Sequence, residues 1–141
     1  MRSQREISEL RRRRQKGNAM VEGALVMLAF MLILFGILDF GRMVWSYTLV
    51  SYGAREATRY AMVRGTDSGH AATVDDIKKI VTGSALGLDS SKITSSVSFS
   101  PDQSAGSTVR VAVTYSFSPL APYMPGGPIS LKSTSQMIIY Q

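Results

Sequence analysis

The side chains that could perform chemistry are few, and they lack the neighbours that a reaction needs. His70 is the only histidine, and no carboxylate lies at helical spacing from it. Asp75 and Asp76 are adjacent, so they would point in different directions on a helix, where acids in the first turn favour the helix itself. No serine lies in a G-x-S-x-G or S-x-x-K context. We therefore predict no catalytic site, and expect His70 to be a solvated loop residue.

Binding chemistry is equally sparse. The sequence contains no cysteine, which excludes a disulfide framework, a thiol nucleophile and a Cys-based metal site. The stretch GLDSSK lacks the spaced glycines of a phosphate loop. These patterns predict a protein that is not an enzyme, holds no metal or other cofactor, and has no small-molecule substrate.

One carboxylate does need an explanation. Glu22 lies at the start of an apolar run and is followed by no other charge until Asp39. An ionised group in or near a bilayer is costly, so such residues are rare unless they have a partner or a function. Glu22 is therefore the first candidate functional residue.

The basic residues are concentrated at the N-terminus. The net charge is +6, but seven of the 16 basic residues precede Gly17, and basic and acidic residues nearly balance after it. The charge of the body thus gives no support to nucleic-acid binding. Lys and Arg gather on the cytoplasmic side of membrane helices, which predicts an N-terminus that stays inside. The orienting residues would be Arg11, Arg12, Arg13, Arg14 and Lys16.

The apolar run predicts a membrane-spanning helix. Residues 23–38 are uncharged, and their flanks extend the run to a helix over about 19–45, with Glu22 near one headgroup layer. At the other layer Asp39 and Arg42, three residues apart, share a helix face and can partly neutralise each other, and Trp45 marks the membrane exit. A cleaved secretory signal peptide is the main alternative, but the residues after the run, DFGRMVWS, offer no small-x-small cleavage site.

The helix should continue beyond the membrane to about Arg64. Apolar or small residues recur four and three positions apart and form one seam, made of Met43, Tyr47, Val50, Ala54, Ala57 and Ala61. A helix over 18–64 would be ~70 Å long, more than twice the thickness of a bilayer core, so its second half must lie outside.

The remainder predicts a small α+β head. The stretch TVDDIKKIV opens with Thr73 as N-cap and carries an apolar stripe of Val74, Ile77, Ile80 and Val81, and Gly83 or Gly87 could end this helix. Residues 92–100, 108–118 and the stretch from Ile129 predict about three antiparallel strands, separated by a hairpin loop and a proline-rich loop at 119–128. The apolar face of this sheet would pack against the helix seam.

We therefore expect an α+β fold in three parts. A basic cytoplasmic leader occupies 1–17, a long helix 18–64, and an extracytoplasmic head 65–141.

The junction KG|NAMVEGALV resembles the processing and assembly motif of type IV prepilins: a basic leader ending in glycine, then an apolar helix whose fifth residue is glutamate. The resemblance implies cleavage by a prepilin peptidase between Gly17 and Asn18, on the cytoplasmic side. The stretch DFGRMVWSYTLVSYGAREATRYAMVRG resembles the TadE-like branch, the minor pilins of the tight-adherence (Flp) secretion system. Gly23 follows Glu22 where major Flp-type prepilins carry an aromatic residue, which argues against a major subunit.

This resemblance implies a pilin-like fold and a single-pass protein of a bacterial inner membrane with a periplasmic head, acting in pilus assembly or secretion. Its partners would be the prepilin peptidase, other pilin or pseudopilin subunits and the inner-membrane assembly platform. Cleavage would free the α-amino group of Asn18, which is mostly protonated at neutral pH. Glu22 could pair with that ammonium group on a neighbouring subunit and so set the axial register. The alternatives are an uncleaved signal anchor carrying a binding or structural head, whose glutamate merely reaches the interface, and a membrane-tethered hydrolase, which no residue pattern supports.

Overall fold

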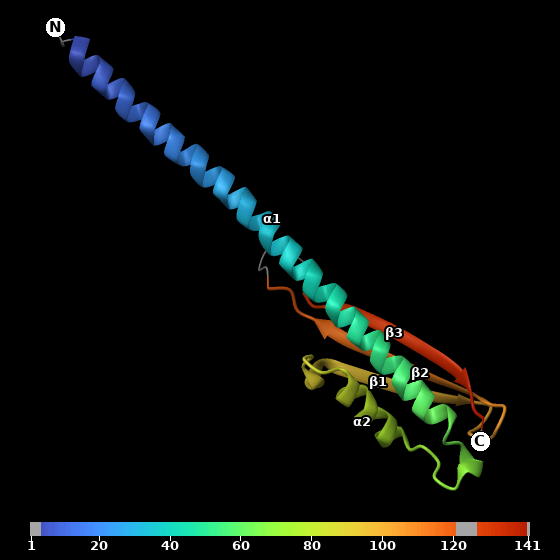
Figure 1. The fold of residues 1–141 in the computed structure, drawn as a ribbon. Helices are drawn as coiled ribbons and strands as arrows, with labels where there is room; N and C mark the ends of the chain where they lie inside the picture. Colours follow the sequence, from blue (N-terminus) through green and yellow to red (C-terminus); the bar gives the residue numbers. More distant parts are fainter. Residues whose placement is uncertain (1–3, 121–126, 141) are drawn as a thin grey trace. The chain divides into compact units, whose positions relative to one another are not determined.

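The computed structural model describes residues 4–120 and 127–140; for residues 4–16 it describes the backbone only. The elements follow the order α1 (Gln4–Met62), η1 (Thr66–Ser68), α2 (Val74–Ser84), η2 (Ser90–Lys92), β1 (Ile93–Ser100), β2 (Thr108–Phe117) and β3 (Ile129–Ile138). A long helix, a short helix and a three-stranded antiparallel sheet confirm the predicted α+β class (Figure 1). The chain divides into two compact units, 1–38 and 39–141.

The first unit consists of the N-terminal part of α1. Its helical backbone includes Gly17 and Asn18, so the helix begins well before the predicted leader boundary. From residue 18 to residue 38 the side chains are exposed, apart from a half-buried Met31. This part of the helix therefore has no core of its own among the described residues.

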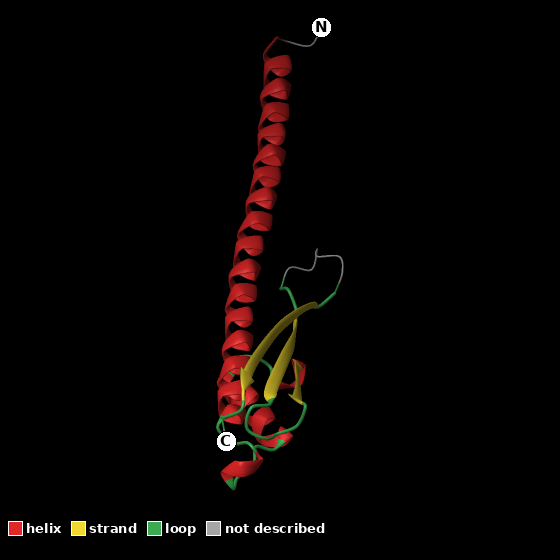
Figure 2. Ribbon diagram, turned by 90° about the vertical axis from the view of Figure 1, so that its right-hand side faces the viewer, coloured by secondary structure: helices red, strands yellow, loops and turns green. Residues whose placement is uncertain are grey.

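The second unit is the head, whose strands Figure 2 draws in yellow, and its sheet has the order β1-β2-β3. Strand β2 is central and pairs with both neighbours, as in Val97↔Val111 on one side and Val111↔Ser135 on the other. Alternate residues of β2 point to one face and form the core, as the period-two pattern predicted. They are Val109, Val111, Val113, Tyr115 and Phe117.

The C-terminal half of α1 and the shorter α2 supply the other side of this core. Val50, Ala54, Ala57 and Ala61 of the predicted seam are buried, and Ile77 and Val81 of α2 join them in one cluster. The two helices are close at Gly53, where a Cβ would lie in van der Waals contact, 3.4 Å from the carbonyl oxygen of Val81. Small residues thus make up most of the α1 side of this core.

Of the predicted seams, Met43 and Ile80 are partly buried, and two other residues are exposed. Tyr47 is 49% exposed, and Ser46 takes its place in the buried row. A helix advances about 100° per residue, so a one-residue offset in a seam read from spacing moves a side chain to the flank. Val74, the first residue of α2, is 43% exposed because the turn that it begins lies at the margin of the core.

Element ends differ from the predictions by a few residues. Helix α1 ends at Met62 rather than Arg64, and β1 begins at Ile93 because Lys92 belongs to η2. Gly83 lies inside α2, which ends at Ser84, so this glycine does not stop the helix. Gly87 lies in the following turn with a φ of 92°, a conformation that glycine adopts without strain.

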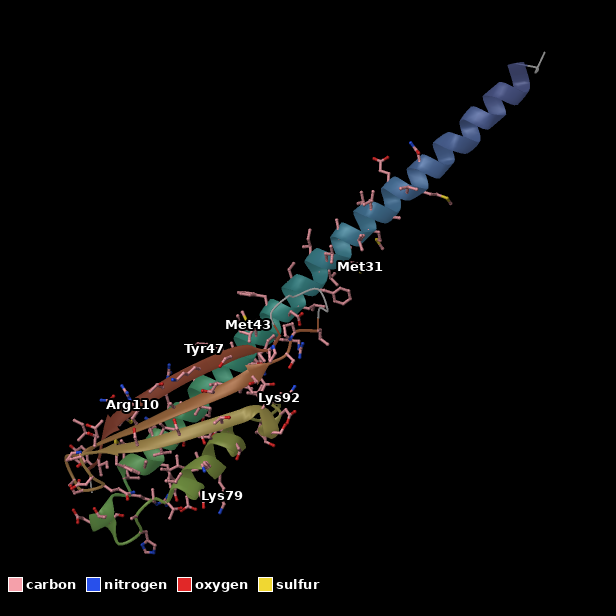
Figure 3. The ribbon with its side chains drawn as sticks, turned by 180° about the vertical axis from the view of Figure 1, so that it is seen from behind. Met31, Met43, Tyr47, Lys79, Lys92 and Arg110 are labelled. Carbon is pink, nitrogen blue, oxygen red and sulfur yellow. The ribbon has the colours of Figure 1, made fainter. Side chains whose placement is uncertain are left out.

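The outer face of the sheet is hydroxyl-rich. Figure 3 views the head from this side, with Arg110 of β2 on the near surface. Arg110 pairs in register with Ser98 and Gln136, and the row Thr94↔Thr114↔Lys132 lies further along. An antiparallel sheet can leave one polar face in solvent, so this face needs no covering layer like the one that the helices form on the other side.

Candidate membrane and assembly segment

The candidate functional residues all lie on α1, so the helix positions them. Helix α1 contains one stretch, Gly17–Met62, that is long and apolar enough to cross a membrane by length and composition. Large apolar side chains point outward along it; among those more than half exposed are Met20, Val21, Leu25, Val26, Met27, Leu28, Phe30, Ile33 and Ile37. In water this surface would be unfavourable by ~25 cal/mol per Å² of apolar area, so a lipid or protein environment is needed to cover it.

The basic leader residues Arg11, Arg12, Arg13, Arg14 and Lys16 lie in the helical backbone of α1. Their side chains are outside the described part of the structure. Their orienting function stays a prediction.

Gly17 and Asn18 lie within the continuous helix. A Cβ built at Gly17 would meet nothing within 4 Å. No close approach inside the chain therefore requires a glycine at this position, although glycine costs a helix interior ~1 kcal/mol relative to alanine.

Glu22 is exposed on the same helix. Among the described residues, no hydrogen bond or ion pair reaches its carboxylate. Its charge has no internal counterpart in that part of the chain, so any pairing partner must come from elsewhere.

Asp39 and Arg42 are brought together, as their spacing predicted. Arg42 Nη1 donates a hydrogen bond to Asp39 Oδ1 over 3.1 Å, and Asp39 is only 7% exposed. The guanidinium carbon of Arg42 also lies 5.4 Å from the centroid of the Phe117 ring, a cation–π arrangement. The pair is therefore packed against the end of β2.

A further partner of Asp39 was missed from the sequence. The backbone N–H of Leu120, 81 residues away along the chain, donates to Asp39 Oδ1 over 3.0 Å. This bond ties the start of the proline-rich segment to the part of α1 at the predicted membrane exit. Spacing along a helix reports only local partners, so no signal in the sequence could have identified it.

Trp45, the predicted membrane-exit residue, is 65% exposed. It lines the rim of a shallow pocket of about 270 Å³ in the head, where the turn before β1 approaches α1. The pocket is lined by Gly41, Arg42, Trp45, Ser46, Gly87, Leu88 and Tyr115. A Trp at this level has the apolar body and polar N–H typical of an interfacial residue.

The head shows no arrangement of reactive groups in its described part. His70 is exposed in the bend before α2, as a solvated loop residue should be.

Asp102 is the centre of a hydroxyl cluster: the hydroxyl groups of Ser104 and Ser107 donate to its carboxylate and lower its pKa to about 2. The hydroxyl of Thr73 likewise lowers the pKa of Asp76. Carboxylates held ionised in this way are poor proton donors at neutral pH, and the described residues include no group of three His, Cys, Asp or Glu that could hold a metal.

Comparison with known families adds one finding. The family model of TadE-like proteins matches residues 17–59, and confirms the resemblance over that segment. No curated protein and no solved structure matches this chain. The match begins at Gly17, includes Glu22, Asp39, Arg42 and Trp45, and ends near the C-terminus of α1.

Proposed function

We propose that this protein is a membrane-anchored, non-enzymatic minor pilin or pseudopilin that supports assembly of a tight-adherence (Flp-type) pilus or a related secretion apparatus. The observation that carries the proposal is the TadE-like match over residues 17–59. It suggests an association with the Tad pilus, and it covers the segment whose apolar surface the chain itself leaves exposed.

The apolar part of α1 would anchor the protein by a single pass at about 19–45. The basic leader would stay in the cytoplasm, since Arg and Lys flank membrane helices on that side. The head would then lie outside the cytoplasmic membrane, and in the periplasm of a cell with two membranes. Its partners would be other pilin or pseudopilin subunits, a prepilin peptidase and the inner-membrane assembly platform with its ATPase.

Cleavage after Gly17 supplies a reason for a glycine that the chain's own packing does not require. A Cβ at Gly17 would have open space, so a requirement for a small residue there would come from another molecule, such as the peptidase. A peptidase needs local access to the backbone, and glycine weakens the helix at the point where it must open. Cleavage would leave Asn18 as the first residue of the mature helix.

Glu22 would act in assembly rather than in folding. Its carboxylate has no partner among the described residues, and an unpaired charge at a membrane helix centre costs ~2.5–3.5 kcal/mol, less near the interface. The α-amino group freed at Asn18 of a neighbouring subunit has a reference pKa of ~7.7–8.0 and would supply the opposite charge. Pairing would therefore favour one axial register between subunits.

The N-terminal residue of the membrane-extracted protein tests processing. We expect intact-mass analysis of protein co-expressed with a prepilin peptidase to give a chain beginning at Asn18, and Gly17→Leu to leave a chain beginning at Met1. A wild-type chain that still begins at Met1 would identify an uncleaved anchor instead. A start beyond Trp45 would mean a secreted domain.

A matched pair of variants tests the assembly charge. Glu22→Gln should leave cleavage and membrane insertion intact but reduce co-purification with other pilus subunits several-fold. Glu56→Gln removes the same charge from the part of α1 that belongs to the head, and should leave co-purification unchanged. Equal recovery with both variants would refute a register function for Glu22.

A further inference from the structure

The polar side of α1 at the predicted membrane exit is covered by the head. Asp39 and Arg42 lie on one face of the helix, where they would otherwise interrupt an apolar surface. Leu120 N–H bonds to Asp39, and the Phe117 ring lies over Arg42. The end of β2 and Leu120, the second residue of the proline-rich segment, are thus fixed against this one turn.

Leu120 itself faces outward. Its side chain is 65% exposed although its backbone N–H is bonded to a carboxylate that is almost fully buried. An exposed leucine alone is ordinary. Its position is informative here, because the bond to Asp39 holds it at the level where the predicted span ends.

At the same level other sides of α1 are also apolar and exposed. Phe40 is 63% exposed, Val44 47% and Trp45 65%. Successive residues are turned by about 100° around a helix, so Phe40 and Val44 lie on one flank and Trp45 on another. The face of α1 that carries Asp39 has no exposed apolar side chain of its own at this level, and Leu120 supplies one. We call these four residues the base patch: Phe40, Val44, Trp45 and Leu120.

Cations border this patch. The side chain of Arg42 is 48% exposed even though it pairs with Asp39. Lys92 Nζ donates to the hydroxyl of Ser118 over 3.3 Å, two residues before Leu120. Apolar side chains with Trp and flanking cations are the composition of a membrane interface, where lipid phosphates lie above the acyl chains.

We propose that the base patch, and Leu120 in particular, inserts into the headgroup layer of the lipid bilayer, so that the head contacts the membrane at a second point besides its helix. The inference rests on the proposed single-pass anchor, since the membrane exit at 39–45 sets the level of the patch. Asp39 is the positioning residue, because it holds Leu120 on α1.

The absence of cysteine allows one fluorophore to be placed at will. We would label Leu120→Cys, Ile33→Cys and Ser96→Cys in the full chain with an environment-sensitive dye, in vesicles of phosphatidylcholine and phosphatidylglycerol. Ile33 lies within the predicted span and Ser96 on the outer sheet face, and both are exposed. Lipids carrying a spin label near the headgroup would serve as quenchers, with iodide as the aqueous quencher.

We expect lipid quenching of the Leu120 label to exceed that of the Ser96 label at least threefold, and iodide quenching to follow the opposite order. Equal behaviour of the Leu120 and Ser96 labels would overturn the proposal, provided that the Ile33 label reports the hydrocarbon. If the Ile33 label is also in water, the membrane anchor itself has failed. Protection of Leu120 that appears only at high protein-to-lipid ratio would identify a second copy of the chain, and would likewise overturn the lipid contact.

A second pair of variants tests the positioning residue. Asp39→Ala in the Leu120→Cys background should lower lipid quenching toward the Ser96 value. Asp89→Ala is the matched control, because the Asp89 carboxylate caps η2 through Ser91 and has no hydrogen bond to Leu120. If lipid quenching is unchanged in Asp39→Ala, and circular dichroism shows a folded head, then Asp39 does not position Leu120. The contact of Leu120 with lipid is then judged by the first measurement alone.

Discussion

The two halves of α1 have the same backbone and opposite requirements. From residue 18 to 38 the helix carries large apolar side chains, and nearly all of them are exposed. From residue 39 to 62 the buried row consists mainly of small residues, such as Ala54, Ala57 and Ala61, each with no exposed surface. A helix that packs closely on a sheet needs small residues at the contact, whereas a helix surrounded by a fluid medium can be covered in large ones. The composition of each half thus reports what surrounds it.

The largest expected effect is on the free energy of unfolding, and it compares a core residue of the head with an exposed residue in the first half of α1. Ile77→Ala removes a fully buried side chain and should lower the free energy of unfolding of the head by ~2–5 kcal/mol. Ile37→Ala removes the same atoms from an exposed position in the first half of α1 and should have almost no effect. Denaturant unfolding of the full chain in detergent, followed by near-ultraviolet circular dichroism, measures both. Equal losses would mean that the two halves are not energetically distinct.

The reverse change, from small to large, sharpens the same comparison. Ala57→Leu forces extra carbon atoms into the contact between α1 and the core, and should destabilise the head by ~1–3 kcal/mol. Ala29→Leu makes the same change at an exposed position and should leave the unfolding midpoint of the head where it was. A tolerated Ala57→Leu would show that the seam is loosely packed and that its alanines are not required.

Local capping tests how far the head is stabilised by its own side chains. Thr73 Oγ1 accepts a hydrogen bond from the backbone N–H of Asp76 over 3.2 Å, at the start of α2. Thr73→Ala should cost ~1 kcal/mol of head stability, because one helix N–H loses its partner. Thr73→Ser keeps the oxygen and should retain most of it. The same denaturant experiment resolves the two variants, and an equal loss in both would assign the effect to the methyl group.

The smallest effect is a pH dependence confined to the head. The hydroxyl groups of Ser104 and Ser107 lower the pKa of Asp102 from 3.8 to about 2. Since the folded-state pKa lies below the unfolded value, this cluster stabilises the fold above pH 3.8, and its contribution is lost as the pH falls toward 2. A carboxyl NMR titration should show that Ser104→Ala raises the pKa of Asp102, while Ser96→Ala on the outer sheet face leaves it unchanged. A pKa of Asp102 near 3.8 in the unmodified protein would contradict the cluster.

Periodic features of the fold could be predicted from the sequence. The alternation of β2 placed five residues correctly in the core, and Thr73 was recognised as the N-cap of α2 by its distance from Asp76. In both cases the physical cause is local: a strand alternates its faces, and a helix N-terminus leaves N–H groups that a nearby hydroxyl can satisfy. The Asp39–Arg42 pair belongs to the same class.

Contacts between distant segments could not be predicted. Asp39 bonds to Leu120, and the side chain of Gln103 donates to the carbonyl oxygen of Ala72 over 2.8 Å, linking the hairpin loop to the segment before α2. Tyr47 was placed on the buried seam and is exposed, because the exact rotation of α1 on the sheet depends on how the head packs. For the candidate site, the charged residues of α1 could be identified from the sequence, but their contacts with Phe117 and Leu120 could not.

The end of the described chain has a consequence for the order of synthesis. Ile139 is buried in the core at 1% exposure, its N–H donates to the carbonyl oxygen of Ser107, and the N–H of Tyr140 donates to Met62 at the end of α1. The core that covers the end of α1 is therefore completed by residues that are synthesised some 75 positions after it. Until then Val50 and the alanines of α1 have no sheet to cover them. Under the single-pass anchor proposed above, the head would still be open while the helix is being inserted, and the apolar stripe of α1 would be exposed at that stage.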